Sequence, residues 1–252
     1  MCLILFAYDI HPEYRLIVAA NRDEFLDRPT DKAGFWDDHP SVLGGRDLKN
    51  GGTWMGVTRS GRFAAVTNYR EPEKKHATAP SRGRLVSDFL ISDKSAQACI
   101  EEFSSRADEY NGFNLLLFDG DDLCWFSNRS EDAEKLSRGL HGLSNHLLDT
   151  QWPKVTDGKR RLKSALELSG PELTDALFCM LEDTVVPPDS ELPDTGVGME
   201  WERILGAKMI VSPGYGTRSC TVLLMNRTGG GFFFEQTIDQ GHPVGKRKEF
   251  LF

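Results

Sequence analysis

The sequence predicts an α+β protein in which two stacked, mostly antiparallel β-sheets are covered by helices. Blocks rich in β-branched and aromatic residues begin and end the chain, and segments with apolar residues at helical spacing lie between them. One face of each sheet can be buried against the other sheet, which leaves the outer faces for helices. No linker rich in Pro, Gly or Ser divides the 252 residues, so we expect a single domain over residues 1–252.

The first third of the chain predicts two hairpins separated by a long loop. Residues 2–9 and 14–21 are apolar runs on either side of a His-Pro-Glu turn. Residues 25–52 are polar and rich in Pro, Gly and Asp, which is typical of an excursion over the surface. Residues 53–58 and 62–68 flank a Ser-Gly turn and form the second predicted hairpin.

Four helices are predicted in the middle of the chain, as two pairs with strands between them. Ser81 can cap the first helix, and the second spans about residues 95–107. The third begins at Trp152-Pro153, and the fourth covers residues 173–181. The remaining predicted strands are residues 113–118, 123–126, 208–211, 219–225 and 231–237.

Composition excludes several classes of partner and location. The formal net charge is −8 and the basic residues are scattered, which argues against nucleic acid as a partner. Five widely spaced cysteines without a Cys-x-x-Cys pair are typical of thiols in a reducing compartment, and no zinc-ligand spacing is present. The sequence contains neither an apolar run of about 20 residues nor a basic signal-peptide region. We therefore expect a cytoplasmic protein without a membrane span.

Cys2 is the residue that points most directly to chemistry. It follows the initiator Met, so removal of that Met would place a thiol and a free α-amino group on one residue. An α-amino group has a pKa of about 7.7–8.0 and can accept the thiol proton, which is the N-terminal-nucleophile arrangement. The ordinary alternative is that Cys2 is a small hydrophobic residue in a buried first strand.

A polar tetrapeptide, Asn21-Arg22-Asp23-Glu24, closes the second predicted strand and would lie close to that thiol. Further motifs follow along nearly the whole chain: Arg28-Pro29-Thr30, Gly44-Gly45-Arg46-Asp47, Gly51-Gly52-Thr53-Trp54, Thr67-Asn68-Tyr69-Arg70, Gly142-Leu143-Ser144-Asn145, Asp149-Thr150, Trp152-Pro153-Lys154 and Tyr215-Gly216-Thr217-Arg218. With the tetrapeptide and these motifs, the chain resembles the NRDE family, also called the Transport and Golgi organisation protein 2 family. Members have been linked to intracellular haem trafficking, so the resemblance implies that haem or a lipid-like acyl group could bind reversibly.

The chain is also similar, more weakly, to the choloylglycine hydrolases and penicillin V acylases, which are N-terminal-nucleophile (Ntn) hydrolases. This resemblance implies a four-layer αββα sandwich and hydrolysis of an amide C–N bond in a small, partly apolar molecule, with no cofactor required. It assigns the nucleophile to Cys2, the carboxylate that holds the α-amino group to Asp23, the oxyanion donors to Asn68 and Asn145, and a late arginine to Arg218. The acylases have an arginine three residues before this aspartate. In this chain the position is occupied by Ala20, and the nearest arginine, Arg22, stands one residue before Asp23.

These residue types suit the implied chemistry. Cationic groups lower the pKa of a neighbouring thiol, so Arg22 and Arg218 are expected to favour the thiolate. Side-chain amides can donate hydrogen bonds to the oxyanion that forms on attack. Each residue also has an ordinary explanation, because asparagine favours turns at strand ends and an arginine can brace a loop.

Several further residues are candidates for ligand binding. Asn21 begins the tetrapeptide, and Trp54 and Tyr69 could line an apolar pocket, although core packing explains such aromatic residues equally well. If haem is the ligand, its iron needs an axial ligand such as His, Cys, Met or Tyr, and His146 and His11 are the histidines to test first. No metal site is predicted for the hydrolase.

Overall fold

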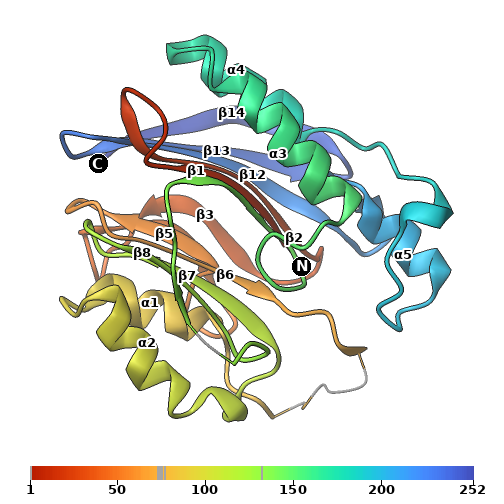
Figure 1. Cartoon of the computed structure of the whole chain (residues 1–252), viewed down its shortest axis with the longest axis horizontal. Coiled ribbons are helices and arrows are strands. Elements are labelled where there is room, and N and C mark those ends of the chain that lie inside the picture. Colours follow the sequence, from red (N-terminus) through yellow and green to blue (C-terminus); the bar gives the residue numbers. More distant parts are fainter. Residues whose placement is uncertain (1, 73–75, 77, 132) are drawn as a thin grey trace.

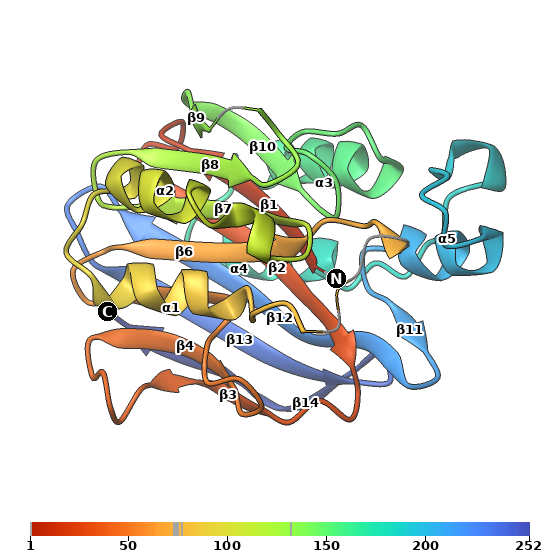
Figure 2. The ribbon, with the colours of Figure 1, turned by 90° about the horizontal axis from the view of Figure 1, so that it is seen from below.

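A computed structural model describes residues 2–72, 76, 78–131 and 133–252 and consists of four layers (Figure 1). Two antiparallel sheets are stacked face to face. One outer face is covered by α3 (Pro153–Ala165) and α4 (Gly170–Leu181), and the other by α1 (Gly83–Ile91) and α2 (Ala96–Ser104), as Figure 2 also shows. The expected α+β architecture, an αββα sandwich, is therefore confirmed.

The first sheet has the strand order β10-β1-β2-β12-β13-β14, with the short β11 paired to β12. It places β2 in the interior of the sheet, between β1 and β12. Its strands are β1 (Cys2–Tyr8), β2 (Tyr14–Phe25), β10 (Gly139–Leu143), β11 (Val211–Ser212), β12 (Tyr215–Asn226), β13 (Gly231–Asp239) and β14 (His242–Leu251).

The second sheet follows chain order from β3 to β9. Its strands are β3 (Thr30–Phe35), β4 (Val42–Asp47), β5 (Met55–Thr58), β6 (Phe63–Asn68), β7 (Phe113–Phe118), β8 (Leu123–Ser127) and β9 (Glu134–Lys135). The fifth helix, α5 (Met199–Gly206), lies beyond the ends of the strands, near the N-terminus of β1 (Figure 1).

Both faces of β1 are buried, because it lies between the second sheet and the helices α3 and α4. Ile4 and Phe6 pack between the two sheets, whereas Leu3 and Leu5 pack beneath α3 and α4. A strand alternates its side chains between its two faces, so even-numbered residues of β1 point between the sheets. Cys2 is one of these even-numbered residues, so its side chain points between the two sheets.

The prediction that residues 25–52 form a surface excursion is wrong, because β3 and β4 lie within this range and extend the second sheet. Neither strand shows an apolar alternation, because β3 begins with three polar residues and β4 contains two glycines. A Cβ atom at Gly44 would lie 2.7 Å from the Met55 carbonyl oxygen of β5, so close strand packing requires glycine there.

Several other boundaries differ from the sequence predictions. Of the predicted strand at residues 208–211, only Val211 belongs to a strand, and α1 begins after Arg82 instead of being capped by Ser81. The elements β9, β10, β14 and α5 were not predicted at all. The mostly exposed β14 lies at the edge of the first sheet and contains Lys246-Arg247-Lys248, and Phe250 near its end packs against the core. Charged edge strands of this kind resist pairing with other chains.

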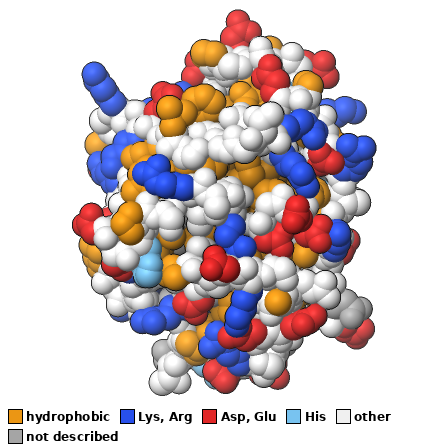
Figure 3. Space-filling view, turned by 90° about the vertical axis from the view of Figure 1, so that its left-hand side faces the viewer, with side chains coloured by type: hydrophobic (Ala, Val, Ile, Leu, Met, Phe, Trp, Pro, Cys, Tyr) orange, Lys and Arg blue, Asp and Glu red, His pale blue; other side chains and the backbone are white. Residues whose placement is uncertain are grey.

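The molecular surface mixes both signs of charge. Figure 3 shows the end that carries the turn between β1 and β2, where basic and acidic side chains are interspersed with apolar ones. Among the described helices, none is long and apolar enough to cross a membrane.

Candidate functional site

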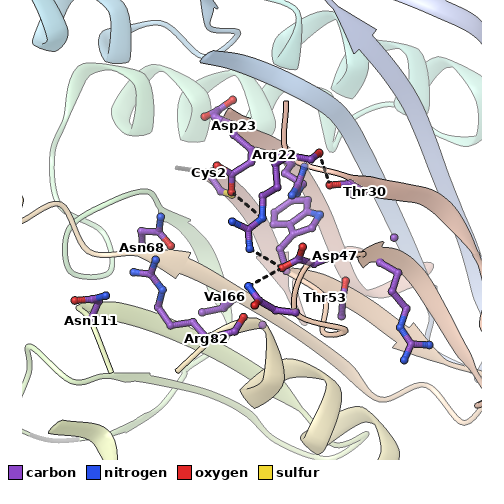
Figure 4. A pocket seen from close by; sticks show the side chains of 18 of the residues that line it. Cys2, Arg22, Asp23, Thr30, Asp47, Thr53, Val66, Asn68, Arg82 and Asn111 are labelled. Atoms are coloured by element: carbon purple, nitrogen blue, oxygen red, sulfur yellow. Dashed lines mark hydrogen bonds and ion pairs between the residues drawn. The ribbon is translucent and has the colours of Figure 1, made fainter. Parts of the chain in front are cut away.

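A pocket of about 230 Å³ opens where the first residue of β1 and the end of β2 meet the amino end of α1 (Figure 4). We call it the thiol pocket. Most of its side chains are polar or charged, so it suits a ligand with ionic or hydrogen-bonding groups. Its described lining includes Cys2, Arg22, Asp23, Glu24, Arg28, Asp47, Trp54, Asn68, Arg82 and Gly83.

The register of the first hairpin brings the thiol to the tetrapeptide. Cys2 pairs with Arg22 across the antiparallel β1 and β2 strands. Residues directly opposite each other in such a pair project to the same face, and for Cys2 and Arg22 this is the face between the sheets. The tetrapeptide therefore lies beside the thiol, as the sequence predicted.

Burial raises the pKa of the Cys2 thiol, and the nearby charge of Asp23 raises it further. A hydrogen bond from the Asp23 backbone N–H and the charge of Arg22 act in the opposite direction but do not compensate. The Arg22 charge therefore acts in the expected direction, but the loss of water around the sulfur outweighs it. A protonated thiol in this pocket needs a base before it can attack.

Asp23 is buried, with 2% of its surface exposed, and its Oδ1 accepts a 2.6 Å hydrogen bond from the Thr217 hydroxyl. Thr217 reaches this position because it pairs with Asp23 across β2 and β12. Burial raises the pKa of the Asp23 carboxyl to about 6, against the charges of Lys154 and Arg22. At neutral pH the carboxylate form still predominates and can hold an ammonium group.

The raised pKa of Asp23 predicts a specific dependence of stability on pH. Between the unfolded value of about 3.9 and the folded value of about 6, the folded protein binds more protons than the unfolded chain. Stability should therefore decline as pH rises through this window, by up to about 3 kcal/mol from this group. Urea denaturation across the window should show a shallower decline for Asp23→Asn, and identical slopes would contradict the assignment.

Lys154 is a buried residue near the thiol pocket whose position the sequence did not predict, although it lies in one of the matching motifs. It is in the first turn of α3, yet it is 4% exposed, and its Nζ donates to the Leu205 carbonyl oxygen at 2.9 Å. Burial lowers the pKa of its ammonium to about 8, with a further decrease from Arg70, while the charges of Asp23 and Cys2 oppose both. A buried cation therefore lies close to Asp23 and Cys2.

Arg82 is a second residue that the sequence analysis missed. It is the N-cap residue of α1, and Figure 4 shows its side chain extending toward Asn68. Its Nη1 donates to the Gly112 carbonyl oxygen at 2.8 Å. Burial lowers the pKa of the Arg82 guanidinium, and the charges of Glu24 and Cys2 oppose this decrease. Arg82 therefore places a positive charge at the wall of the thiol pocket.

The amino end of α1 is held in place by contact between two backbones. The N–H of Thr53 donates to the Gly83 carbonyl oxygen at 3.2 Å. A Cβ atom at Gly52 would lie 2.5 Å from the Gly83 carbonyl carbon, so only glycine fits at this position. This contact fixes the distance of Arg82 from the second sheet.

The two predicted oxyanion donors are in contact but differ in position. Asn68 ends β6 and lines the thiol pocket (Figure 4). Asn145 is fully buried behind it, where its Nδ2 donates to the Asn68 carbonyl oxygen at 3.0 Å and its own carbonyl oxygen accepts from the Arg70 N–H at 2.8 Å. The structure therefore presents Asn68 to the pocket and uses Asn145 to hold the end of β6.

Arg218 lies beside a second pocket, of about 270 Å³, which shares Arg22, Thr30, Gly45 and Trp54 with the thiol pocket. The Arg218 Nη1 donates to the carbonyl oxygens of Phe25 at 3.0 Å and Arg28 at 3.1 Å. The register between β2 and β12 shifts at this point, which is typical of a β-bulge. Arg218 lines the second pocket and is not among the described residues that line the thiol pocket.

Asn21 and His11 take structural positions in the described chain. Asn21 points toward the helices, where its Nδ2 donates to the carbonyl oxygens of Leu181 and Lys208 at 2.8 Å each. His11 lies in the turn at the opposite end of β1 from Cys2, and its Nδ1 accepts from the backbone N–H groups of Glu13 and Tyr14 at 3.2 and 3.3 Å. Each side chain stabilises backbone in its own part of the fold.

Tyr69 and His146 form a contact of their own. The Tyr69 hydroxyl lies 2.8 Å from the His146 Nε2, and the His146 Nδ1 lies 3.0 Å from the Thr150 hydroxyl. Burial lowers the pKa of the His146 imidazole. This network joins the segment after β6 to the loop after β10. The described residues contain no group of three or more His, Cys, Asp or Glu that could hold a metal ion.

Comparison with known proteins relates the whole chain to one family. The family model described as Transport and Golgi organisation 2 matches residues 1–240. The Homo sapiens Transport and Golgi organization protein 2 homolog is 38% identical over 273 residues, which cover 99% of each chain. The Bos taurus homolog is 38% identical over 264 residues, covering 97% of this chain and 95% of the relative. The Drosophila melanogaster protein is 27% identical, with 98% and 95% covered.

Two solved structures are similar at much lower sequence identity. One is a Caenorhabditis elegans ortholog of N-acylethanolamine-hydrolyzing acid amidase, with a TM-score of 0.48, 9% identity, and coverage of 88% of this chain and 92% of the other. The other is a mutant of the conjugated bile acid hydrolase from Clostridium perfringens, with a TM-score of 0.44, 11% identity, and coverage of 99% and 92%.

Proposed function

The chain belongs to the Transport and Golgi organisation 2 family, and we propose that it hydrolyses an amide C–N bond with Cys2 as an N-terminal nucleophile. The observation that carries this proposal is the position of the Cys2 thiol. It is buried opposite Arg22 and lines the same pocket as Asp23 and Asn68. The ordinary explanation, a small hydrophobic residue in the core, does not account for this polar surrounding.

The proposed reaction begins with a free α-amino group on Cys2. Removal of Met1, which lies outside the described residues, would create this amine. The amine takes the thiol proton, which matters here because burial raises the pKa of the thiol. The sulfur then attacks the amide carbon, and the Asn68 side chain donates a hydrogen bond to the resulting oxyanion.

The remaining steps return the site to its starting state. Collapse of the oxyanion breaks the C–N bond, and the leaving amine takes the proton held by the Cys2 ammonium. The acyl group stays on the sulfur as a thioester. Water then attacks the thioester and loses a proton to the Cys2 amine, which releases the carboxylic acid and restores the thiol. Asp23 orients the amine throughout by accepting a hydrogen bond from it.

Haem carriage, the alternative that the family resemblance raises, has less support in the thiol pocket. Haem iron takes an axial ligand such as His, Cys, Met or Tyr, and of the described lining residues only Cys2 belongs to that set. The thiol pocket therefore offers a single axial ligand among its described lining residues, and that residue is the proposed nucleophile.

Covalent labelling tests the proposed nucleophile. A β-lactam or activated amide probe is expected to transfer its acyl group to residue 2, and intact-mass analysis with peptide mapping would locate it. The Cys2→Ala protein should remain unmodified. Cys179→Ala, which removes the exposed thiol, should label as the unchanged protein does.

The same spectra give the outcomes that would overturn the proposal. Retention of the initiator Met would leave the amine one residue away from the thiol. An adduct confined to Cys179, or none across a panel of probes, would exclude Cys2 as the nucleophile. A haem-dependent absorbance change that the Cys2→Ala protein lacks, together with no adduct, would support the carrier instead.

A further inference from the structure

Charges in the thiol pocket are paired unevenly. Arg28 lies 2.6 Å from Asp47 and 3.8 Å from Glu24, so these two carboxylates share one arginine. Arg46 is paired outside the pocket with Asp38. Two guanidinium groups, those of Arg22 and Arg82, are left without a carboxylate partner at salt-bridge distance among the described residues.

Arg22 is the more unusual of the two. Its residue surface is 7% exposed, and its guanidinium makes no hydrogen bond or ion pair within the described part of the chain. Its charge lowers the pKa of Asp23 and of Glu235, so both carboxylates are near, but each is hydrogen-bonded elsewhere, to Thr217 and to the Ala33 N–H. Arg22 lines the thiol pocket, so its unused N–H donors can be satisfied there by oxygen atoms of a ligand.

Arg82 adds a second cation on the opposite wall of the pocket, at the amino end of the nine-residue α1. A helix N-terminus favours anions, and the first turn of α1 contains no acidic side chain that would offset this preference. A guanidinium presents a planar fork of N–H groups that matches a carboxylate. Arg22, Arg82 and Gly83 at the start of α1 line the same pocket, so their N–H groups are available to bind a small anion there.

The second pocket supplies the complementary feature. Beyond Arg22 and Trp54 it is lined in part by Leu26, Ile238 and Val244. A ligand that reaches from one pocket to the other would thus have an ionic group near Arg82, a central portion beside Cys2 and Asn68, and an apolar portion beyond Trp54.

We propose that the ligand of this site is an N-acylated amino acid or a related amide, whose carboxylate is bound by Arg82 and Arg22 and whose acyl chain enters the second pocket. This inference rests on the proposed function for the position of the amide, but the carboxylate contact can be measured without turnover. Arg82 is then a specificity-determining residue.

Binding to the Cys2→Ala protein tests the proposal. The two probes are an N-octanoyl aminonitrobenzoic acid and the corresponding carboxamide, which differ only in the charge of one group. Calorimetry is expected to show about 10- to 100-fold tighter binding of the acid, as hydrogen bonds to a charged group imply. Arg82→Gln in the same background should remove most of this preference and leave the affinity for the carboxamide unchanged.

The control is Arg84→Gln, which removes an exposed arginine two residues along α1 and should preserve the preference. Equal affinities for the acid and the carboxamide, no binding of either, or an equal loss for both probes in Arg82→Gln would each overturn the carboxylate site. A failure of the proposed function would be recognised by a different result: the protein that retains the Cys2 thiol would not be labelled at Cys2.

Discussion

Replacement of Asn68 by alanine is expected to slow acylation of Cys2 by about 10²- to 10³-fold, equivalent to about 2.7–4 kcal/mol of barrier. Asn68 ends β6 and lines the pocket that contains the thiol. Alanine cannot donate to the oxyanion that forms on the carbonyl oxygen. The rate of adduct formation, followed by intact-mass analysis at a fixed probe concentration, measures the effect.

Asn68→Asp is the matched variant for this prediction. It preserves the shape of the side chain but removes the N–H donors and adds a negative charge, so acylation should slow at least as much as in Asn68→Ala. Urea denaturation of both variants shows whether the fold is retained. Acylation of Asn68→Ala at the wild-type rate, with the fold intact, would remove Asn68 from the mechanism.

Glu202→Ala is expected to destabilise the folded protein by about 3–5 kcal/mol, as removal of one partner of a buried ion pair does. The Glu202 carboxylate lies 2.7 Å from the Arg70 guanidinium, and the two side chains are 2% and 4% exposed. Glu202 also accepts hydrogen bonds from the N–H and hydroxyl of Thr195, at 2.7 and 2.6 Å. The free energy of unfolding in urea measures the change.

An exposed ion pair near Glu202 provides the control. Arg203 and Asp189 are 54% and 52% exposed at their side chains, so Asp189→Ala should leave the urea midpoint unchanged. The double variant Arg70→Met/Glu202→Leu should recover much of the stability that Glu202→Ala loses, because it removes both charges. An unchanged midpoint for Glu202→Ala would show that Arg70 is stabilised by other groups.

This ion pair connects the region around α5 to the candidate site. Arg70 follows Asn68 by two residues, and its backbone N–H donates to the Asn145 carbonyl oxygen. Lys154 makes a second connection through the Leu205 carbonyl oxygen. Loss of Glu202 should therefore disturb the end of β6 as well as α5.

The sequence was informative where a local pattern determines the structure. The hairpin of β1 and β2 follows from two apolar runs around a proline turn, and its register places Arg22 beside Cys2. The strand β4 was missed because its two glycines provide close packing and not an apolar pattern, and β3 was missed because it begins with three polar residues. A charged edge strand such as β14 likewise gives no alternation for a sequence pattern to reveal.

Within the site, the positions of Lys154, Arg82 and Arg218 depend on packing between distant segments. A lysine in the first turn of an amphipathic helix would ordinarily be expected in solvent, and only the approach of Leu205 gives the Lys154 ammonium a buried partner. Arg82 reaches the pocket because α1 docks on Gly52. The bulge in β12 sets the position of Arg218. No residue pattern in this part of the sequence predicts the register shift of one residue that produces the bulge.

The burial of Cys2 in an interior strand also has a practical consequence for anyone who prepares this protein. The strand that contains Cys2, β1, lies between β2 and β10, and the Cys2 side chain lines the thiol pocket. An affinity tag or fusion partner attached ahead of Cys2 would add polypeptide at this pocket and acylate the amine that the proposed reaction requires. Purification handles belong after Phe252, beyond the exposed β14.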